Sequence, residues 1–135
     1  MGRMIPKVLG LLFCDAVYRD TKWCLLGLFN GLVAPDYPTT IPKLHIFFVL
    51  SGISGTATIR LALCRADEDD LGSDITVAGA EMTVEADDRM SIVEGPISIE
   101  NLVLDMPSSY TLRLFYGDEE IGSRSFDAVQ REAGP

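Results

Sequence analysis

The stretch 67–74 holds the densest set of oxygen ligands in the chain, four aspartates and one glutamate. Calcium prefers carboxylate oxygens and takes about six to eight oxygen ligands. The stretch does not fit the EF-hand pattern, because Leu71 stands where an Asp or Asn ligand belongs and no Glu closes the loop. One hypothesis is therefore a calcium site gathered by the loops of a β-sandwich, made by Asp67, Asp69, Asp70 and Asp74. The other interpretation is a solvated acidic loop that aids solubility.

Residues that could perform nucleophilic or acid–base catalysis are few, and their spacing does not favour an active site. His45 is the only histidine, and neither a nucleophile nor a carboxylate stands next to it in the sequence. General-base catalysis needs such a partner at hydrogen-bonding distance. Ser54 follows Gly52 as in a nucleophile elbow, but residue 56 is Thr where that motif has Gly. We therefore expect a protein without enzymatic activity and without a cofactor.

Three cysteines, Cys14, Cys24 and Cys64, lack the CxxC spacing of zinc or thioredoxin-like sites. If 5–14 and 22–33 form a hairpin, Cys14 and Cys24 lie roughly opposite each other and could oxidise to a disulfide. The alternative is that they stay reduced and half-buried, which is usual in a cytosolic chain.

The composition indicates one globular domain in a chain of 135 residues. Apolar residues make up 47% of the chain and charged residues 23%, which is unlike a disordered protein. The net charge of −9 disfavours contact with a phosphate backbone, so we expect no nucleic-acid partner. The longest apolar run, 23–34, is too short for a membrane span and contains Asn30. With no export signal that fits the pattern, we expect a cytoplasmic location.

The segments that would position a functional site are predicted to be β-strands. In these segments apolar and polar residues alternate, and clusters of turn residues separate one segment from the next. The predicted strands are 6–14, 22–33, 43–50, 56–65, 75–84, 90–104, 110–116 and 121–129. They predict one all-β domain over 1–135, a Greek-key-like antiparallel β-sandwich of about eight strands. Its core would span about 5–128, with a short tail over 129–135. A helix over 16–32 is the competing interpretation, and Gly27 and Gly31 disfavour it.

Two of these segments change the side on which their apolar residues fall. The change occurs across Glu100–Asn101 and again across Gly122–Ser123. Such a change inside a strand is typical of a β-bulge or a corner. We therefore expect 90–104 to be a bent strand, or two strands, crossing between sheets.

The first three predicted strands are apolar on both faces, which is unusual in an antiparallel sandwich with one wet face per sheet. Such strands need a cover, either from the loop 34–42 or from another molecule, since helices are too few in this chain to provide it. Cover by another molecule predicts a homo-oligomer or an unidentified protein partner. The predicted interface residues are Leu9, Leu11, Leu25, Leu28, Phe29, Phe47, Phe48 and Val49.

Several short motifs occur together in order: Cys14–Asp15, Gly27–Leu28–Phe29, Tyr37–Pro38, Tyr110-x-Leu112 and Phe126. In order and spacing they resemble an uncharacterised bacterial family of small β-sandwich proteins, a domain of unknown function, over about 5–128. Ser108–Ser109 replaces the glycine-containing turn that is commoner there. The resemblance implies a sandwich fold and supplies no catalytic residues. The resulting hypothesis is a non-catalytic interaction or assembly module that associates through its apolar N-terminal strands. The alternative is a calcium-dependent, C2-like sandwich using the acidic loop.

Overall fold

Nine strands form in the computed structural model, which describes residues 5–70 and 72–131. The described residues contain no helix, so the all-β prediction is confirmed and a helix over 16–32 is excluded. The strands are β1 (Lys7–Asp20), β2 (Lys22–Phe29), β3 (Gly31–Ala34), β4 (Thr39–Ser51), β5 (Gly55–Ala66), β6 (Asp74–Ala86), β7 (Val93–Leu104), β8 (Ser108–Tyr116) and β9 (Glu119–Gln130). The last of these includes Val129 and Gln130, and residues 132–135 of the predicted tail lie outside the described range.

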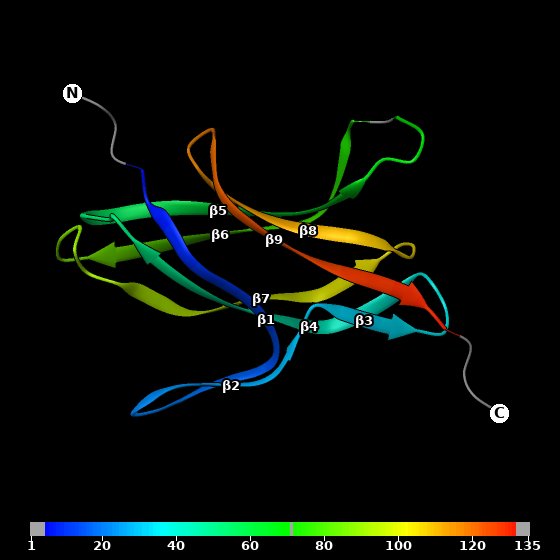
Figure 1. Cartoon of the computed structure of the whole chain (residues 1–135), viewed down its shortest axis with the longest axis horizontal. Coiled ribbons are helices and arrows are strands. Elements are labelled where there is room, and N and C mark those ends of the chain that lie inside the picture. The colour runs from blue at the N-terminus through cyan, green and yellow to red at the C-terminus, as the bar shows by residue number, and fades with distance from the viewer. Residues whose placement is uncertain (1–4, 71, 132–135) are drawn as a thin grey trace.

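The strands form two sheets that face each other (Figure 1). Sheet A has the strand order β2-β1-β4-β7, and sheet B has the order β3-β9-β8-β5-β6. Neighbouring strands run antiparallel except β3 and β9, which are parallel. The predicted number of about eight strands, all antiparallel, is therefore wrong by one strand and by this one parallel pair.

The ninth strand arises because the predicted strand 22–33 is divided at Asn30, where the chain passes from sheet A to sheet B. The Asn30 carbonyl accepts a hydrogen bond from the Asp127 amide at 3.0 Å. Arg124 Nη2 donates another to Asn30 Oδ1 at 2.7 Å. Both bonds tie the crossing point to β9, beside which β3 then pairs.

The core lies between the sheets and consists of alternate residues from strands of both. In β5, Ile59, Leu61 and Leu63 are fully buried, as the alternation predicts. Three aromatic rings meet at one side of this core. The Phe126 ring lies 5.1 Å from the Phe13 ring and 5.6 Å from the Tyr110 ring, so β1, β8 and β9 join through direct ring contacts.

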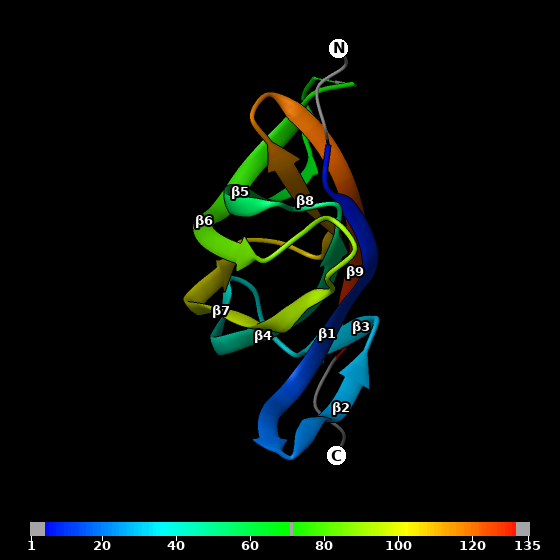
Figure 2. The ribbon, with the colours of Figure 1, turned by 90° about the vertical axis from the view of Figure 1, so that its left-hand side faces the viewer.

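Sheet B is strongly curled, and it approaches β1 along one side (Figure 2). The contact depends on Gly122 of β9, where an added Cβ would lie 2.8 Å from a Val8 methyl group. A register shift between Leu114 and Phe115 leaves Ile121 as an extra residue in β9. The predicted bulge beside Gly122 is therefore confirmed, and it bends the strand toward β1.

The other change of side, at Glu100–Asn101, has a different cause. Strand β7 stays paired with β4 along its whole length, so it does not cross between sheets as predicted. Asn101 instead adopts a positive φ of 53° beside the point where Pro42 interrupts the pairing. Proline has no amide hydrogen to give to the ladder, and asparagine tolerates the left-handed conformation. One residue thus moves the apolar side chains to the other parity without a bulge.

The turn from β7 in sheet A to β8 in sheet B is fixed by Tyr110. Its hydroxyl donates to the Met106 carbonyl at 2.6 Å and lies 3.2 Å from the Asp105 carboxylate. Burial raises the pKa of this hydroxyl, so it stays a donor. Arg65 holds Asp105 from β5 with an N–O distance of 2.6 Å, which lowers the pKa of that carboxyl. The arrangement matches the tyrosine corner of β-sandwich proteins.

Candidate interaction surface

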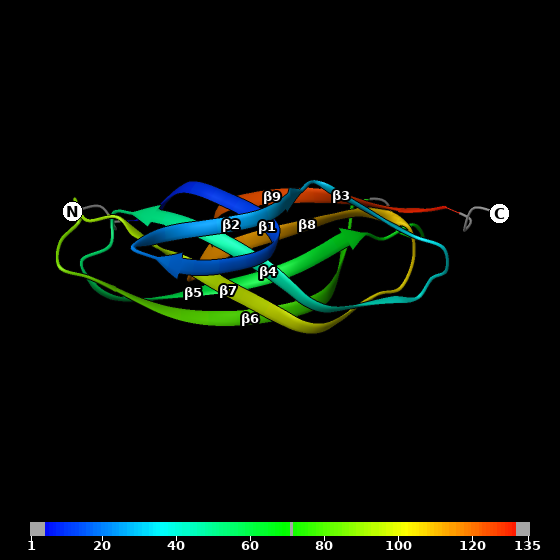
Figure 3. The same ribbon diagram turned by 90° about the horizontal axis from the view of Figure 1, so that it is seen from below.

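Strands β1 and β2 form a hairpin that continues past the rest of sheet A. The first half of β1 pairs with β4, and its second half, from Phe13 to Asp20, pairs with β2. Figure 3 shows the hairpin crossing in front of sheet A when the molecule is seen from below. The Trp23 ring of the hairpin packs edge-to-face on Phe47 of β4, with ring centroids 5.8 Å apart. The hairpin therefore lies against the face of sheet A that points away from sheet B.

This packing answers the question raised by strands that are apolar on both faces. Phe47 is only 6% exposed, because Trp23 of the same chain covers it. Leu11 and Phe48 are also 6% exposed and belong to the core between the sheets. These three predicted interface residues are thus covered within the chain. The cover of Phe47 therefore comes from the chain itself, but from a hairpin and not from the loop 34–42 that the sequence offered as the internal alternative.

The hairpin has a second face, which remains exposed. The register places Tyr18 opposite Cys24, Ala16 opposite Leu26, and Cys14 opposite Leu28. Side chains two residues apart share a face along a regular strand, so Ala16, Tyr18, Cys24 and Leu26 lie on one face, which we call the outer hairpin face. Leu28 follows Gly27, whose positive φ interrupts this alternation. Tyr18, Leu26 and Leu28 are 49%, 54% and 60% exposed. Of these, the sequence predicted only Leu28 as an interface residue.

The path of β2 depends on a glycine in the middle of the strand. Gly27 has a φ of 68°, a conformation that side chains disfavour. The Asp15 side chain of β1 lies directly over it, and an added Cβ would collide with the carboxylate. Gly27 therefore lets the two strands stay closely paired beneath the Asp15 side chain, while Leu26 and Leu28 on either side of it are exposed.

Strand β2 is also an edge of sheet A, so one row of its backbone N–H and C=O groups faces away from the sheet. Between Trp23 and Phe29 it carries neither a charged residue nor a proline. The opposite edge, β7, carries Glu94, Pro96 and Glu100, which are residues that block pairing with another chain. Among the strand edges described, β2 is thus the long one without this protection.

The two edge strands of sheet B have other features that disfavour pairing with another chain. Strand β6 carries Glu81 and Glu85 and lies close to β7. Strand β3 has only four residues, too few to offer a long template. Among the described edges, β2 is thus the long one with neither a charged residue nor a proline in its middle.

The remaining predicted interface residues are Leu9, Leu25, Phe29 and Val49, and they differ in exposure. Leu9 is the extra residue of a bulge between Val8 and Gly10 and is 49% exposed. Leu25 and Val49 are half-buried. Phe29 is half-buried as well, because its ring stacks on Phe13 at 5.9 Å.

The cysteines do not pair. Cys14 lies opposite Leu28 and Cys24 lies opposite Tyr18, so the predicted juxtaposition of the two cysteines is wrong by four positions of register. All three cysteines are free. Burial, and to a lesser degree the nearby Asp15 charge, raises the pKa of the Cys14 thiol. A thiol held in its neutral form is a poor nucleophile.

The acidic loop directs its carboxylates to separate partners. Asp67 accepts a hydrogen bond from the Asp69 amide at 3.0 Å, and Asp70 accepts one from the Ser73 hydroxyl at 2.7 Å. Asp74 is held by Arg113 at 2.9 Å. Leu71 lies outside the described residues. Within the described part of the loop and the rest of the described chain, no three His, Cys, Asp or Glu side chains converge as a metal site would require.

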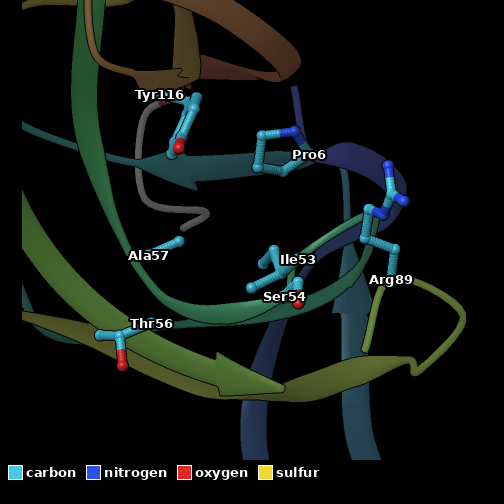
Figure 4. A pocket seen from close by; sticks show the side chains of 8 residues that line it. Pro6, Ile53, Ser54, Thr56, Ala57, Arg89 and Tyr116 are labelled. Carbon is cyan, nitrogen blue, oxygen red and sulfur yellow. The ribbon is translucent and has the colours of Figure 1, made fainter. Parts of the chain in front are cut away.

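The two residues considered for catalysis lie in different places. Ser54 lines a pocket of about 400 Å³ together with Ile53, Arg89 and Tyr116 (Figure 4). His45 lines a smaller groove of about 190 Å³, where it faces Ser98 of β7. No carboxylate is among the described residues that line the groove. A Ser–His arrangement needs an orienting group and oxyanion donors in addition.

Comparison with known proteins bears on the fold. A search of curated proteins gives no match to this chain. The alkylpurine DNA glycosylase AlkC of Pseudomonas fluorescens, solved with DNA containing an abasic site analog, aligns with 94% of this chain and 31% of its own, at 9% identity and a TM-score of 0.55. The chain therefore spans about a third of that protein's length. An immunoglobulin-like protein from Pseudomonas aeruginosa aligns over 92% of this chain and 96% of its own, at 14% identity and a TM-score of 0.47. At 9% identity the likeness to AlkC concerns the fold alone.

No helix that could cross a membrane occurs in the described part of the chain. The model of one protein family, described as a family of unknown function (DUF6941), matches residues 9–129. This range covers nearly all of both sheets, including the whole of β2 and the Tyr110 corner. The resemblance to a family of unknown function is confirmed, and the chain belongs to the DUF6941 family.

Proposed function

We propose that this chain is a non-catalytic interaction module that binds another protein by adding an extended strand to β2. The observation that carries the proposal is the unguarded edge of β2, whose Leu26 and Leu28 are 54% and 60% exposed. In such strand addition, backbone hydrogen bonds supply affinity and alternate side chains supply specificity. The frame would be a β-sandwich with Greek-key-like connections, which is supported by the two facing sheets and the Tyr110 corner.

The hairpin that carries this edge is held against sheet A. One of its faces contacts sheet A through the Trp23 ring on Phe47, which leaves the free edge of β2 pointing away from the sheet. Tyr18 and Leu26 are exposed on the other face, and Leu28 is exposed beyond Gly27, so all three can contact the side chains of an added strand. An exposed apolar patch on a sheet edge marks a protein interaction site more often than an ordinary surface does.

The non-catalytic part of the proposal is supported by the dispersal of the reactive residues. Cys14 is buried with a raised pKa, and the Ser54 pocket and the His45 groove are separate. The expected absence of a cofactor belongs to the same proposal.

The test uses a fluorescent peptide of alternating valine and threonine, flanked at each end by one lysine and one glutamate so that its net charge is zero. We expect saturable binding by fluorescence polarisation, and we expect Leu28→Asp to abolish it. Val103→Asp is the matched control, because Val103 is 49% exposed on β7, the other edge strand of sheet A. The control adds the same charge and should leave binding intact. Peptide binding that is absent, or equally reduced in both variants, would overturn the proposal.

A further inference from the structure

We infer that the Ser54 pocket binds a carboxylate that is carried by a small apolar group. The pocket has a volume of about 400 Å³, which lies in the range of small-molecule sites. None of the described residues that line it belongs to β2, so this site is independent of the proposed strand addition.

Segments that are distant in the sequence build this pocket together. Pro6 precedes β1, Ile53 and Ser54 lie in the turn between β4 and β5, Arg89 lies in the loop between β6 and β7, and Tyr116 ends β8. Figure 4 shows Tyr116 and Pro6 above the pocket, Ile53 and Ser54 below it, and Arg89 at its right-hand side. The pocket therefore has a cation at one side and apolar residues around it.

The backbone beside the pocket is held in place at Gly52. The Gly52 amide donates a hydrogen bond to the Arg89 carbonyl at 3.2 Å, which ties the β6–β7 loop to the β4–β5 turn. An added Cβ at Gly52 would lie 3.4 Å from the Ile5 carbonyl oxygen and 3.5 Å from the Pro6 Cα, so the turn also packs closely on the chain before β1. Arg89 is thus anchored at the pocket through its main chain, while its side chain is exposed.

The charge in the pocket is opposite in sign to that of the whole chain. The chain has 20 acidic against 11 basic residues, yet the described residues that line the pocket include Arg89 and no carboxylate. The ion pairs among the described residues belong to other arginines, so the Arg89 guanidinium has no acidic partner there. The neighbouring Asp88 accepts hydrogen bonds from the amides of Met90 and Ser91, at 2.8 and 3.1 Å, and is used by its own turn. The guanidinium is left for an anion from outside the chain.

An adjoining cavity of about 520 Å³ shares Gly52 and Arg89 with the Ser54 pocket. It is lined by both Lys7 and Asp88, so a positive and a negative charge balance there. An anion is therefore favoured on the Ser54 side of Arg89, where no acid opposes it.

The lining of the Ser54 pocket favours a carboxylate with an apolar body. A guanidinium presents parallel N–H groups that match the two oxygens of a carboxylate. Phosphate sites gather several amide or cationic donors, whereas a single cation is found among the described lining residues. Pro6, Ile53 and Ala57 are buried and apolar, and they suit a hydrocarbon group. A short branched acid has this combination, and so does the C-terminal residue of a peptide that ends in leucine.

The first experiment titrates the isotope-labelled chain with isocaproate and follows the amide resonances of residues 52–57 by NMR. We expect saturable shifts with a dissociation constant on the order of 1 mM. Isocaproamide has the same shape without the charge and should bind at least about tenfold more weakly. An absence of saturable shifts, or equal binding of the acid and the amide, would overturn the inference.

Two variants locate the anion, and both change exposed side chains, so we expect the fold to persist. Arg89→Gln should weaken isocaproate binding by about 10- to 100-fold, because a hydrogen bond between charged groups is lost. Lys7→Gln is the matched control, since it removes the same charge at the adjoining cavity and should change the dissociation constant by less than about threefold. Equal weakening in both variants would overturn the assignment to the Ser54 pocket.

A tripeptide that ends in leucine, with a free or an amidated C-terminus, distinguishes the two sources of the carboxylate. Tighter binding of the free-carboxylate tripeptide than of isocaproate assigns the pocket to a peptide C-terminus, and the reverse order assigns it to a free acid. Carboxylates that bind no better than their amides overturn the site for both sources. That failure leaves strand addition at β2 standing, because the valine–threonine peptide reports on it separately.

Discussion

Replacing Tyr110 by phenylalanine tests whether the corner between the two sheets holds the fold together. The ring is fully buried, so the change keeps the packing and removes only the hydroxyl. That hydroxyl donates to the Met106 carbonyl at 2.6 Å, a short bond that joins the turn after β7 to the start of β8.

The magnitude follows from what the change leaves behind. A typical hydrogen bond contributes about 0.5 to 1.5 kcal/mol, and an acceptor left without a donor costs about 1 to 3 kcal/mol. Met106 is half-buried, so water can reach its carbonyl only in part. We therefore expect a loss of about 1 to 2 kcal/mol in the free energy of unfolding. For a chain of this length, that lowers Tm by about 4 to 7 °C.

Urea unfolding measures this loss, because a shift of the midpoint at constant m-value reports a change in stability alone. Tyr18→Phe is the matched control, since the Tyr18 side chain is 49% exposed on the hairpin. We expect that control to change stability by less than about 0.5 kcal/mol. The reasoning is refuted if the two variants are equally stable, or if the Tyr110→Phe variant unfolds with an altered m-value.

Three further predictions concern the hairpin, the acidic loop and the ion pair beside the corner. Trp23→Ala removes the ring that covers Phe47, and a half-buried tryptophan should cost about 1 to 3 kcal/mol of unfolding free energy in urea. Millimolar calcium should leave Tm unchanged in a thermal melt, because a ligand of the native state would raise it and the loop carboxylates have other partners. Hydrogen bonding to Arg65 lowers the pKa of Asp105, so its contribution to stability is present above the ordinary aspartate pKa and is lost as pH falls through the lowered value. The stability difference between wild type and Asp105→Asn, followed by urea unfolding against pH, should therefore shrink below about pH 4.

The sequence predicted much of the frame because strand periodicity is a local property. The alternation of Ile59, Leu61 and Leu63 placed β5 correctly, and Gly122 marked a bulge that the structure contains. Asn101 could not be distinguished from a corner, because a single residue of positive φ changes parity in the same way as a bend between sheets. The split at Asn30 was missed because its cause is a contact with β9, far away in the sequence.

The candidate site could be predicted only in part. Strands that are apolar on both faces do need a cover, and Phe47 has one. The source of that cover was hidden, because Asp15, Arg19 and Asp20 made 15–21 look like a loop when it is the polar end of a long hairpin. Pairing that segment with β2 would have exposed Leu26 and Tyr18 as surface residues, and the glycine at 27 was the available signal for close pairing.

The parallel pair of β3 and β9 has a consequence for folding during synthesis. Strand β3 can pair only after its partner strand β9 has been synthesised, because Gly31 pairs with Asp127. At ribosomal rates the synthesis of the residues between them takes about 5 to 20 s. The β1–β2 hairpin needs only a tight turn and leaves the ribosome long before that. During those seconds the free edge of β2 is exposed on an incomplete chain. Neighbouring ribosomes on the same messenger RNA carry identical copies of this hairpin.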